Sequence, residues 1–175
     1  MRTRTLAAGL LAGFAAFALH AQPGPSDPQI AHIVVTANQV DIDAGKLAEK
    51  KGSSKDVRAF GKQMVTDHTA VNKSATDLAG KLKVTPRDNP TSESLKSGGD
   101  KNLAHLRTLT GTSFDKAYVD HEVAYHQQVI DALDKTLIPG ATNSELKALL
   151  IKVRPAFVAH LEHAKRLQSS TSKEG

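Results

Sequence analysis

The sequence predicts an all-α protein, a four-helix bundle whose second and third helices are joined by a long crossover. Apolar residues recur every three or four positions through four long stretches, which is the period of a helix with one buried face. Two of the connections between these stretches are short, whereas the middle one has about 27 residues. No stretch shows the alternation that is typical of a β-strand.

Composition limits the chemistry of the protein. The 175 residues include no Cys, so disulfides, thiolate metal ligands and thiol catalysis are excluded together. The net charge is +5, and Lys and Arg are scattered among Asp and Glu, which indicates a solvated surface rather than a nucleic-acid interface. We therefore expect no nucleic-acid partner, and any site must use His, carboxylates, Tyr and hydroxyl groups.

Residues 1–21 have the pattern of a secretory signal peptide. Arg2 and Arg4 precede an apolar stretch at 6–19, which is shorter than a typical membrane-spanning helix, and Ala21 suits cleavage. We expect a soluble, periplasmic mature protein that begins near Gln22 and has no stable membrane span. Its net charge falls from +5 to +3 because two arginines are removed. An uncleaved N-terminal anchor is the alternative.

The first helix is expected from residue 26 to about residue 51. Ser26 and Gln29 match a capping box, Pro28 suits the first turn, and Gly52 follows the last turn. Asp41 lies inside its apolar stripe, where a carboxylate is costly unless it is paired or bound to something. The stripe comprises Ile30, Ile33, Val34, Ala37, Val40, Ala44, Leu47 and Ala48.

The second helix is expected from Ser53 to about residue 83, and Pro86 stops it. His68 falls within its apolar stripe and Asp67 lies at the edge of the stripe. Because only a few residues separate the first two helices, they should form an antiparallel hairpin.

The crossover, residues 86–112, is rich in Pro, Gly, Ser and Asp. Leu103, Leu106 and Leu109 predict a short extra helix packed across one end or side of the bundle. A connection of this length can span the bundle, so we expect the third helix to run parallel to the second.

The third helix, residues 112–137, places Glu122 and His126 one turn apart on the flank of its apolar stripe. It ends at the Ile-Pro-Gly sequence of residues 138–140.

The fourth helix, residues 142–169, opens with Thr142 and Glu145 as a second capping box. His160 lies in its apolar stripe and His163 at the edge of the stripe. The bundle domain is thus expected over residues 26–169, followed by a flexible tail at 170–175.

Every predicted helix of the bundle carries ionisable residues on its buried face. Four-helix bundles build metal sites in this way, and carboxylates with imidazoles suit a divalent ion of iron, manganese, zinc or copper. We predict a metal site without a catalytic residue. Its ligands are Asp41, His68, Glu122, His126 and His160, with Asp67 and His163 as additional candidates.

The same residues also permit a core without metal. Glu122 and His126 can pair across one turn, and a lone His160 can be satisfied by hydrogen bonds. Under this alternative the domain is a structural or interaction module of the cell envelope. Its partner would be an envelope protein or a second copy of the chain.

Three segments, FGKQMVTDH, FDKAYVDHEVAYHQQVIDAL and HLEHAKRL, resemble an exported bacterial family, the domain of unknown function 4142. The resemblance covers about residues 30–167 and implies a ferritin-like bundle without an established activity. Di-iron ferritin-like proteins carry Glu-x-x-His on two helices, a motif that this sequence lacks. A di-iron oxidase or peroxide-consuming enzyme is therefore a third hypothesis. The leading one is a periplasmic, ferritin-like metal-binding protein for metal handling or envelope stress.

Overall fold

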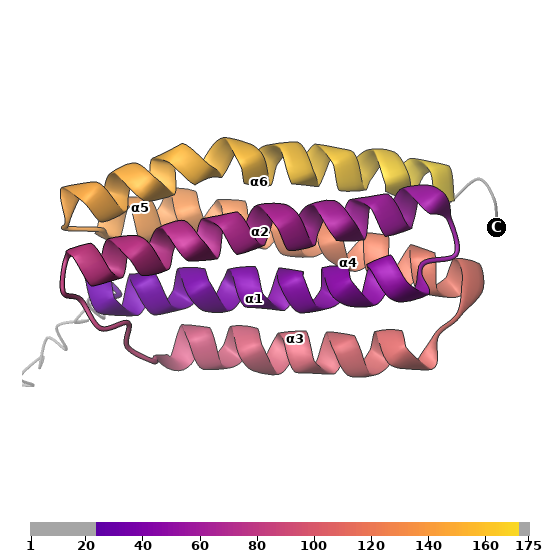
Figure 1. The fold of residues 1–175 in the computed structure, drawn as a ribbon, viewed down its shortest axis with the longest axis horizontal. Coiled ribbons are helices and arrows are strands. Elements are labelled where there is room, and N and C mark those ends of the chain that lie inside the picture. Colours follow the sequence, from indigo (N-terminus) through magenta and orange to yellow (C-terminus); the bar gives the residue numbers. More distant parts are fainter. Residues whose placement is uncertain (1–23, 172–175) are drawn as a thin grey trace, which may run out of the picture.

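The computed structural model describes residues 24–171 of the chain (Figure 1). The predicted signal peptide, residues 1–21, and the tail from residue 172 onwards lie outside the described residues. The helices are α1 (Asp27–Lys51), α2 (Lys55–Lys81), α3 (Pro90–Thr108), α4 (Gly111–Ala132), the π-helix η1 (Leu133–Leu137), α5 (Ile138–Gly140) and α6 (Ser144–Thr171). Helix α6 thus runs past residue 169, the predicted end of the bundle.

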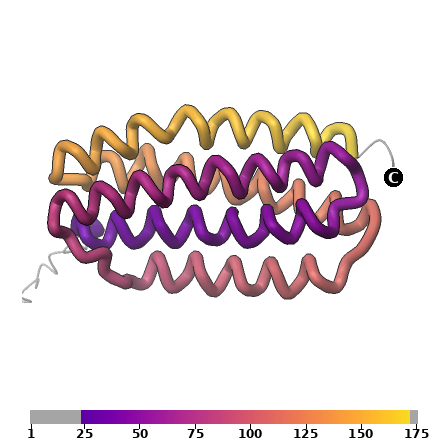
Figure 2. The backbone as a smooth tube through the Cα atoms, in the orientation of Figure 1, coloured from indigo at the N-terminus to yellow at the C-terminus, as the bar shows by residue number. Residues whose placement is uncertain are grey.

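The elements form an all-α bundle of four long helices, as predicted. Helices α1 and α2 make one antiparallel hairpin, and α4, continued by η1 and α5, makes a second hairpin with α6 (Figure 1). The tube in Figure 2 shows that α2 and α4 run in the same direction, because α3 carries the chain back along the whole bundle. The predicted parallel arrangement of the second and third bundle helices is confirmed.

The crossover helix differs from the prediction of a short helix. Helix α3 has 19 residues and lies along α1 on the outside of the bundle (Figure 1). Gly99 makes this close packing feasible, because a Cβ there would lie 2.8 Å from a methyl group of Val40 on α1. The ends of α3 are also tied to α1. The Asn89 side chain donates to the Gln29 carbonyl, and Lys51 Nζ donates to the Leu109 carbonyl at 2.8 Å.

Hydrogen-bonding side chains fix where the helices begin. The capping box of Ser26 and Gln29 is present as predicted. Helix α2 is capped by Ser54 rather than Ser53. The backbone N–H groups of both serines donate to the buried carboxylate of Asp115 on α4.

The caps of the last two long helices also lie one or two residues from their predicted positions. Helix α4 begins at Gly111, whose φ of +59° is readily adopted only by glycine. Helix α6 is capped by the Asn143 side chain, which accepts from the N–H groups of Glu145 and Leu146. Thr142, the predicted cap, donates instead to Asp27 at the start of α1.

Two glycines bring the backbones of α1 and α2 into close contact. A Cβ atom on Gly45 would lie 2.7 Å from the Gly61 carbonyl oxygen, and one on Gly61 would lie 2.7 Å from the Gly45 carbonyl oxygen. This contact sets the register of the hairpin. Because the helices are antiparallel, residues one or two turns before Gly45 face residues one or two turns after Gly61.

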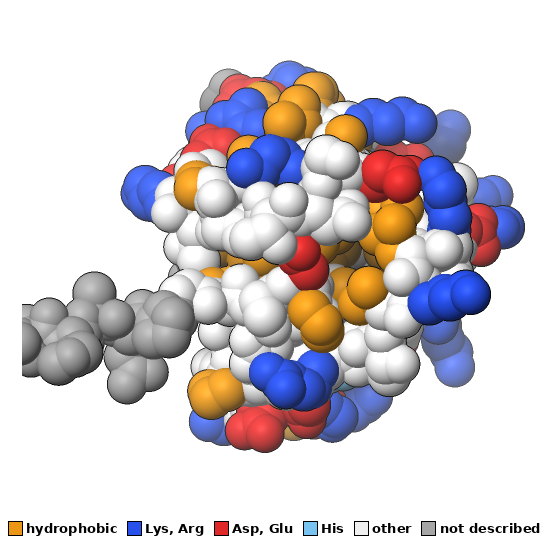
Figure 3. All heavy atoms as spheres, turned by 90° about the vertical axis from the view of Figure 1, so that its left-hand side faces the viewer, with side chains coloured by type: hydrophobic (Ala, Val, Ile, Leu, Met, Phe, Trp, Pro, Cys, Tyr) orange, Lys and Arg blue, Asp and Glu red, His pale blue; other side chains and the backbone are white. Residues whose placement is uncertain are grey.

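The apolar core consists of two clusters, one toward each end of the bundle. The first includes Ile30, Leu133 and Leu150, and the second includes Phe60 and Tyr118. A view onto the end where α1 and α6 begin shows hydrophobic side chains between charged ones at the rim (Figure 3). In residues 24–171, no helix is both long enough and apolar enough to cross a membrane.

Candidate metal centre

A layer of buried polar side chains lies between the two apolar clusters, at mid-height in the bundle. All four long bundle helices contribute to it, and each residue is at most 3% exposed. The layer comprises Asn38 and Asp41 from α1, His68 from α2, Glu122 and His126 from α4, and His160 from α6. The helical period places these residues on the same inward faces as their apolar neighbours, so burial is imposed on them by the fold.

The three histidines converge on one point. Their ring centroids are 5.6 Å apart for His68 and His126, 5.2 Å for His68 and His160, and 5.4 Å for His126 and His160. One ring nitrogen from each lies within 4.8 Å of the corresponding nitrogens of the other two. Three nitrogens at such distances can surround one metal ion after small side-chain movements, since zinc–nitrogen bonds are about 2 Å long.

Each of these histidines uses one ring nitrogen in a hydrogen bond to an oxygen. His68 Nδ1 donates to Asn38 Oδ1 at 2.7 Å, and His126 Nδ1 donates to the Glu122 backbone carbonyl at 3.0 Å. His160 Nε2 donates to Asp67 Oδ2 at 2.9 Å. Metal-binding histidines are normally oriented by a hydrogen bond of this kind from the nitrogen that does not bind the metal.

The other nitrogen of each ring is buried and has no hydrogen-bond partner within the described part of the chain. These atoms are His68 Nε2, His126 Nε2 and His160 Nδ1. Leaving a buried polar atom unsatisfied costs about 1–3 kcal/mol, so three such atoms in one place require an explanation.

Two carboxylates adjoin the histidines. Asp41 and Glu122 form a second set of potential metal ligands with His126. Glu122 Oε2 lies 3.3 Å from His126 Nδ1, and Asp41 Oδ2 lies 3.5 Å from His68 Nε2. By geometry, no described residue gives these four carboxylate oxygens or the Tyr118 hydroxyl a well-aligned hydrogen bond. The groups are nevertheless close enough that contact with Glu122 contributes to raising the pKa of Asp41 and of Tyr118, after the larger effect of burial.

Burial and mutual repulsion control the charges of this layer. Burial raises the pKa of Asp41 well above its usual range, and the neighbouring Glu122 raises it further. Burial alone would lower the pKa of His126, but Asp41 and Glu122 outweigh that effect and raise it to about 9. Burial and the other imidazoles lower the pKa of His68, and burial also lowers that of His160. His68 and His160 are therefore neutral at pH 7, the form that binds metals.

The structure brings the five predicted ligands together, but in two sets of three that share His126. The two additional candidates have other positions. Asp67 is half-exposed and reaches the layer only through its hydrogen bond to His160. His163 faces away from the layer, with its Nδ1 3.1 Å from Gln63 Oε1 and its ring edge-on to Phe60.

Asn38 is a member of the layer that the sequence analysis missed. It is buried, its Nδ2 donates to the Val34 carbonyl, and its Oδ1 receives the hydrogen from His68. Its position three residues before Asp41, on the same helix face, is the signal that could have identified it.

Comparisons with known proteins give one match. Searches of curated proteins and of solved structures return no match for this chain. A family model described as Domain of unknown function (DUF4142) matches residues 12–167, which includes every residue of the polar layer. The chain belongs to this family, the domain of unknown function 4142.

Proposed function

We propose that the protein binds one divalent transition-metal ion in the core of its bundle. The ligands are the unpartnered nitrogens of His68, His126 and His160, with the Asp41 carboxylate as a fourth. The observation that supports this most directly is the difference between the two ring nitrogens of each histidine. One nitrogen of each ring is hydrogen-bonded to an oxygen and the other is buried without a described partner, while the three ring centroids lie only 5.6, 5.2 and 5.4 Å apart.

Charge balance favours the same conclusion. Two ionised carboxylates buried side by side repel each other, and a single 2+ ion neutralises both. Asp41 and Glu122 lie within one possible ligand set, and without metal their burial and proximity raise the pKa of Asp41, so that this carboxyl holds a proton. A divalent ion would replace that proton and compensate both carboxylates.

The donor set narrows the choice of metal. Three imidazoles and one carboxylate suit zinc, copper or iron, whereas calcium and magnesium prefer sites made of oxygen ligands. Manganese, which favours oxygen ligands, fits less well. We infer a role in metal handling or in the response to envelope stress, for an exported, ferritin-like protein of the periplasm.

The decisive experiment combines elemental analysis with thermal unfolding. Purified protein should contain close to one equivalent of a transition metal, and adding that metal to stripped protein should raise Tm. The free energy of unfolding should increase by ~2.7 kcal/mol when free metal is present at one hundred times its Kd.

Two variants and one matched control test the ligands. His126→Ala and His160→Ala should each abolish the metal-induced rise in Tm. His163→Ala, on α6 but bonded to Gln63, should retain it. If the metal-induced rise were absent from the wild type, or persisted in His126→Ala and His160→Ala, the site would be refuted.

A second candidate is a polar core that holds no metal and serves an envelope interaction module. The observation that favours it is the set of internal pairs, His126 with Glu122 and His160 with Asp67. Under this candidate, added metal leaves Tm unchanged. Glu122→Ala should then destabilise the protein by roughly 1–3 kcal/mol, because His126 loses its partner.

A further inference from the structure

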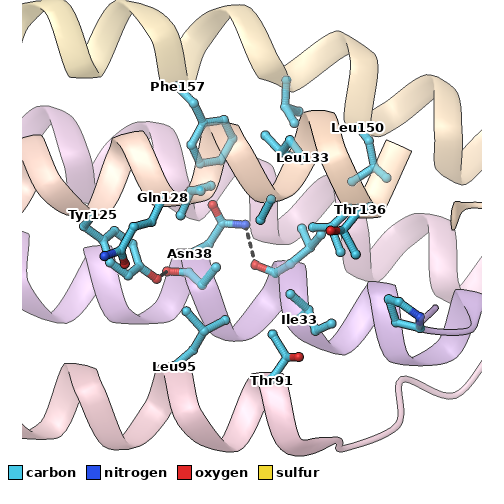
Figure 4. Close-up of a pocket in the computed structure, with 17 residues that line it drawn as sticks. Ile33, Asn38, Thr91, Leu95, Tyr125, Gln128, Leu133, Thr136, Leu150 and Phe157 are labelled. Atoms are coloured by element: carbon cyan, nitrogen blue, oxygen red, sulfur yellow. Dashed lines mark hydrogen bonds between the residues drawn. The ribbon is translucent and has the colours of Figure 1, made fainter. Parts of the chain in front are cut away.

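An apolar pocket of about 320 Å³ lies beside the polar layer. Helices α1, α3, α4 and α6 and the π-helix η1 all contribute to its wall. Figure 4 shows Asn38, Tyr125 and Phe157 toward one side of the pocket, and Leu133 and Leu150 toward the other. A volume of this size falls in the range of small-molecule sites, and it is about twice that of engineered cavities that bind benzene.

The pocket shares a wall with the histidine layer. Asn38 lines the pocket and also accepts the hydrogen bond from His68. Phe157 lines it too, and its ring lies edge-on to that of His68 with 5.2 Å between centroids. A molecule in the pocket would therefore be separated from the histidines only by the side chains of Asn38 and Phe157.

The lining indicates the chemistry of the occupant. Among residues 24–171, no Lys, Arg, Asp, Glu or His lines the pocket. The two inner polar groups are already satisfied, since the Asn38 amide bonds Val34 and His68, and the Tyr125 hydroxyl donates to the Ala37 carbonyl at 3.1 Å. Thr91, Gln128 and Thr136 line the pocket and are exposed, so polar groups are available only at its rim. A charged ligand would lose its hydration without compensation in this environment.

The backbone is also unusual at this wall. The Ile138 N–H donates to the Leu133 carbonyl, five residues earlier, which defines η1 as a π-helical turn. Leu133, Thr136 and Leu137 from this turn all line the pocket. Single π-helical turns inside α-helices occur frequently at functional sites.

We propose that this pocket binds a small, neutral, mainly apolar molecule, such as a compound with two aromatic rings, against the Asn38–Phe157 wall. The site does not require a metal, so this proposal can be tested independently of the proposed metal centre. The pocket volume excludes a folded partner, and its uncharged lining selects against ionised ligands.

The neutral fluorescent probe N-phenyl-1-naphthylamine tests this proposal, because its emission rises in apolar surroundings. It should bind metal-stripped wild-type protein saturably, at one site per chain. Ala132→Phe places a ring into the pocket and should weaken binding at least tenfold. Ala124→Phe, the same change at an exposed position of α4 that does not line the pocket, should bind as the wild type does.

Val153→Phe fills the pocket from α6 and is a second test, should Ala132→Phe fail to fold. Circular dichroism establishes that each variant retains its helices. The proposal is overturned if the wild type shows no saturable binding. Equal binding by the wild type and by a folded pocket-filling variant would also overturn it. Metal binding measured on the same samples reports separately on the histidine site.

Discussion

At the scale of single residues, Asn38 determines which nitrogen of His68 is free. The Asn38 Nδ2 donates to the Val34 carbonyl, so its Oδ1 must be the atom that faces His68. An oxygen there requires His68 Nδ1 to donate, and the lone pair of the neutral ring is then on Nε2. A short polar side chain thus selects the tautomer that binds a metal.

Asn38→Ala should therefore lower metal affinity without removing a ligand. We expect a loss of roughly 10- to 100-fold, as is typical when the group that orients a metal-binding histidine is removed. Competition with a chromophoric chelator measures the change in Kd. Asn72→Ala is a matched control, since Asn72 on α2 also donates to an α1 carbonyl but makes no hydrogen bond to the three histidines. Equal losses in both variants would argue against a specific role for Asn38.

Metal affinity should rise with pH. The pKa of His126 and that of Asp41 are both raised, and the charge of Asp41 is one cause of the His126 shift, so together these two groups hold one or two protons in metal-free protein under conditions where ordinary His and Asp hold none. The metal must displace these protons, and each one displaced makes Kd fall by up to about tenfold per pH unit below the pKa of that group. Titrations at pH 6, 7 and 8 in the same buffer system measure this slope. A Kd independent of pH would contradict the assigned protonation.

Sequence periodicity located the residues of the layer but not their pairings. Asp41, His68 and His160 stood out because each interrupts an apolar stripe, and Glu122 because it lies on the flank of one. Their partners could not be deduced, because the register between helices depends on backbone contacts such as that between Gly45 and Gly61. Asp67 is an example, since it belongs to α2 beside His68 but bonds His160 on α6.

At the scale of helices, this glycine pair is what aligns α1 with α2. Asn38 and Asp41 lie one to two turns before Gly45, and His68 lies about two turns after Gly61. Antiparallel helices that cross at the glycines therefore bring these polar residues face to face.

Gly61→Ala should force the two helices apart. Its Cβ would lie 2.7 Å from the Gly45 carbonyl oxygen, a backbone atom that cannot rotate away. We expect a loss of about 1–3 kcal/mol in the free energy of unfolding, measured by chemical denaturation. Gly80→Ala is the control on the same helix. Nothing lies within 4 Å of its Cβ position, so it should raise stability by up to about 1 kcal/mol. A stable Gly61→Ala protein would show that the hairpin can shift.

The crossover shows where local composition misleads. Gly98, Gly99 and the serines of residues 90–108 are typical of a loop, yet they form a helix that runs the length of the bundle. Because Gly99 has no Cβ, α3 can approach Val40 closely. A residue that weakens an isolated helix therefore improves the packing of this helix. Such tertiary compensation is not visible in the local sequence.

At the scale of the whole molecule, the polar layer depends on completion of the fold. Its ligands come from α1, α2, α4 and α6, so no hairpin alone assembles the site. The bundle and its parallel second and third helices were predictable, because helix lengths and connection lengths leave few other arrangements. The apolar pocket was not, since it arises where five elements meet and includes a π-helical turn.

Helix α3 supplies none of the six residues of this layer, and only Ser92, Gly99 and Leu106 within it are buried. It acts as a strap fastened at its ends by Asn89 and Lys51. Such a segment can lift while the rest of the bundle stays folded, so its amide hydrogens should exchange with deuterium fastest among the long helices. Lys51→Met should accelerate that exchange in α3 and leave α2 and α6 unchanged. Thr91 and Leu95 of this strap border the apolar pocket, so its lifting rate would set how quickly a guest molecule enters and leaves.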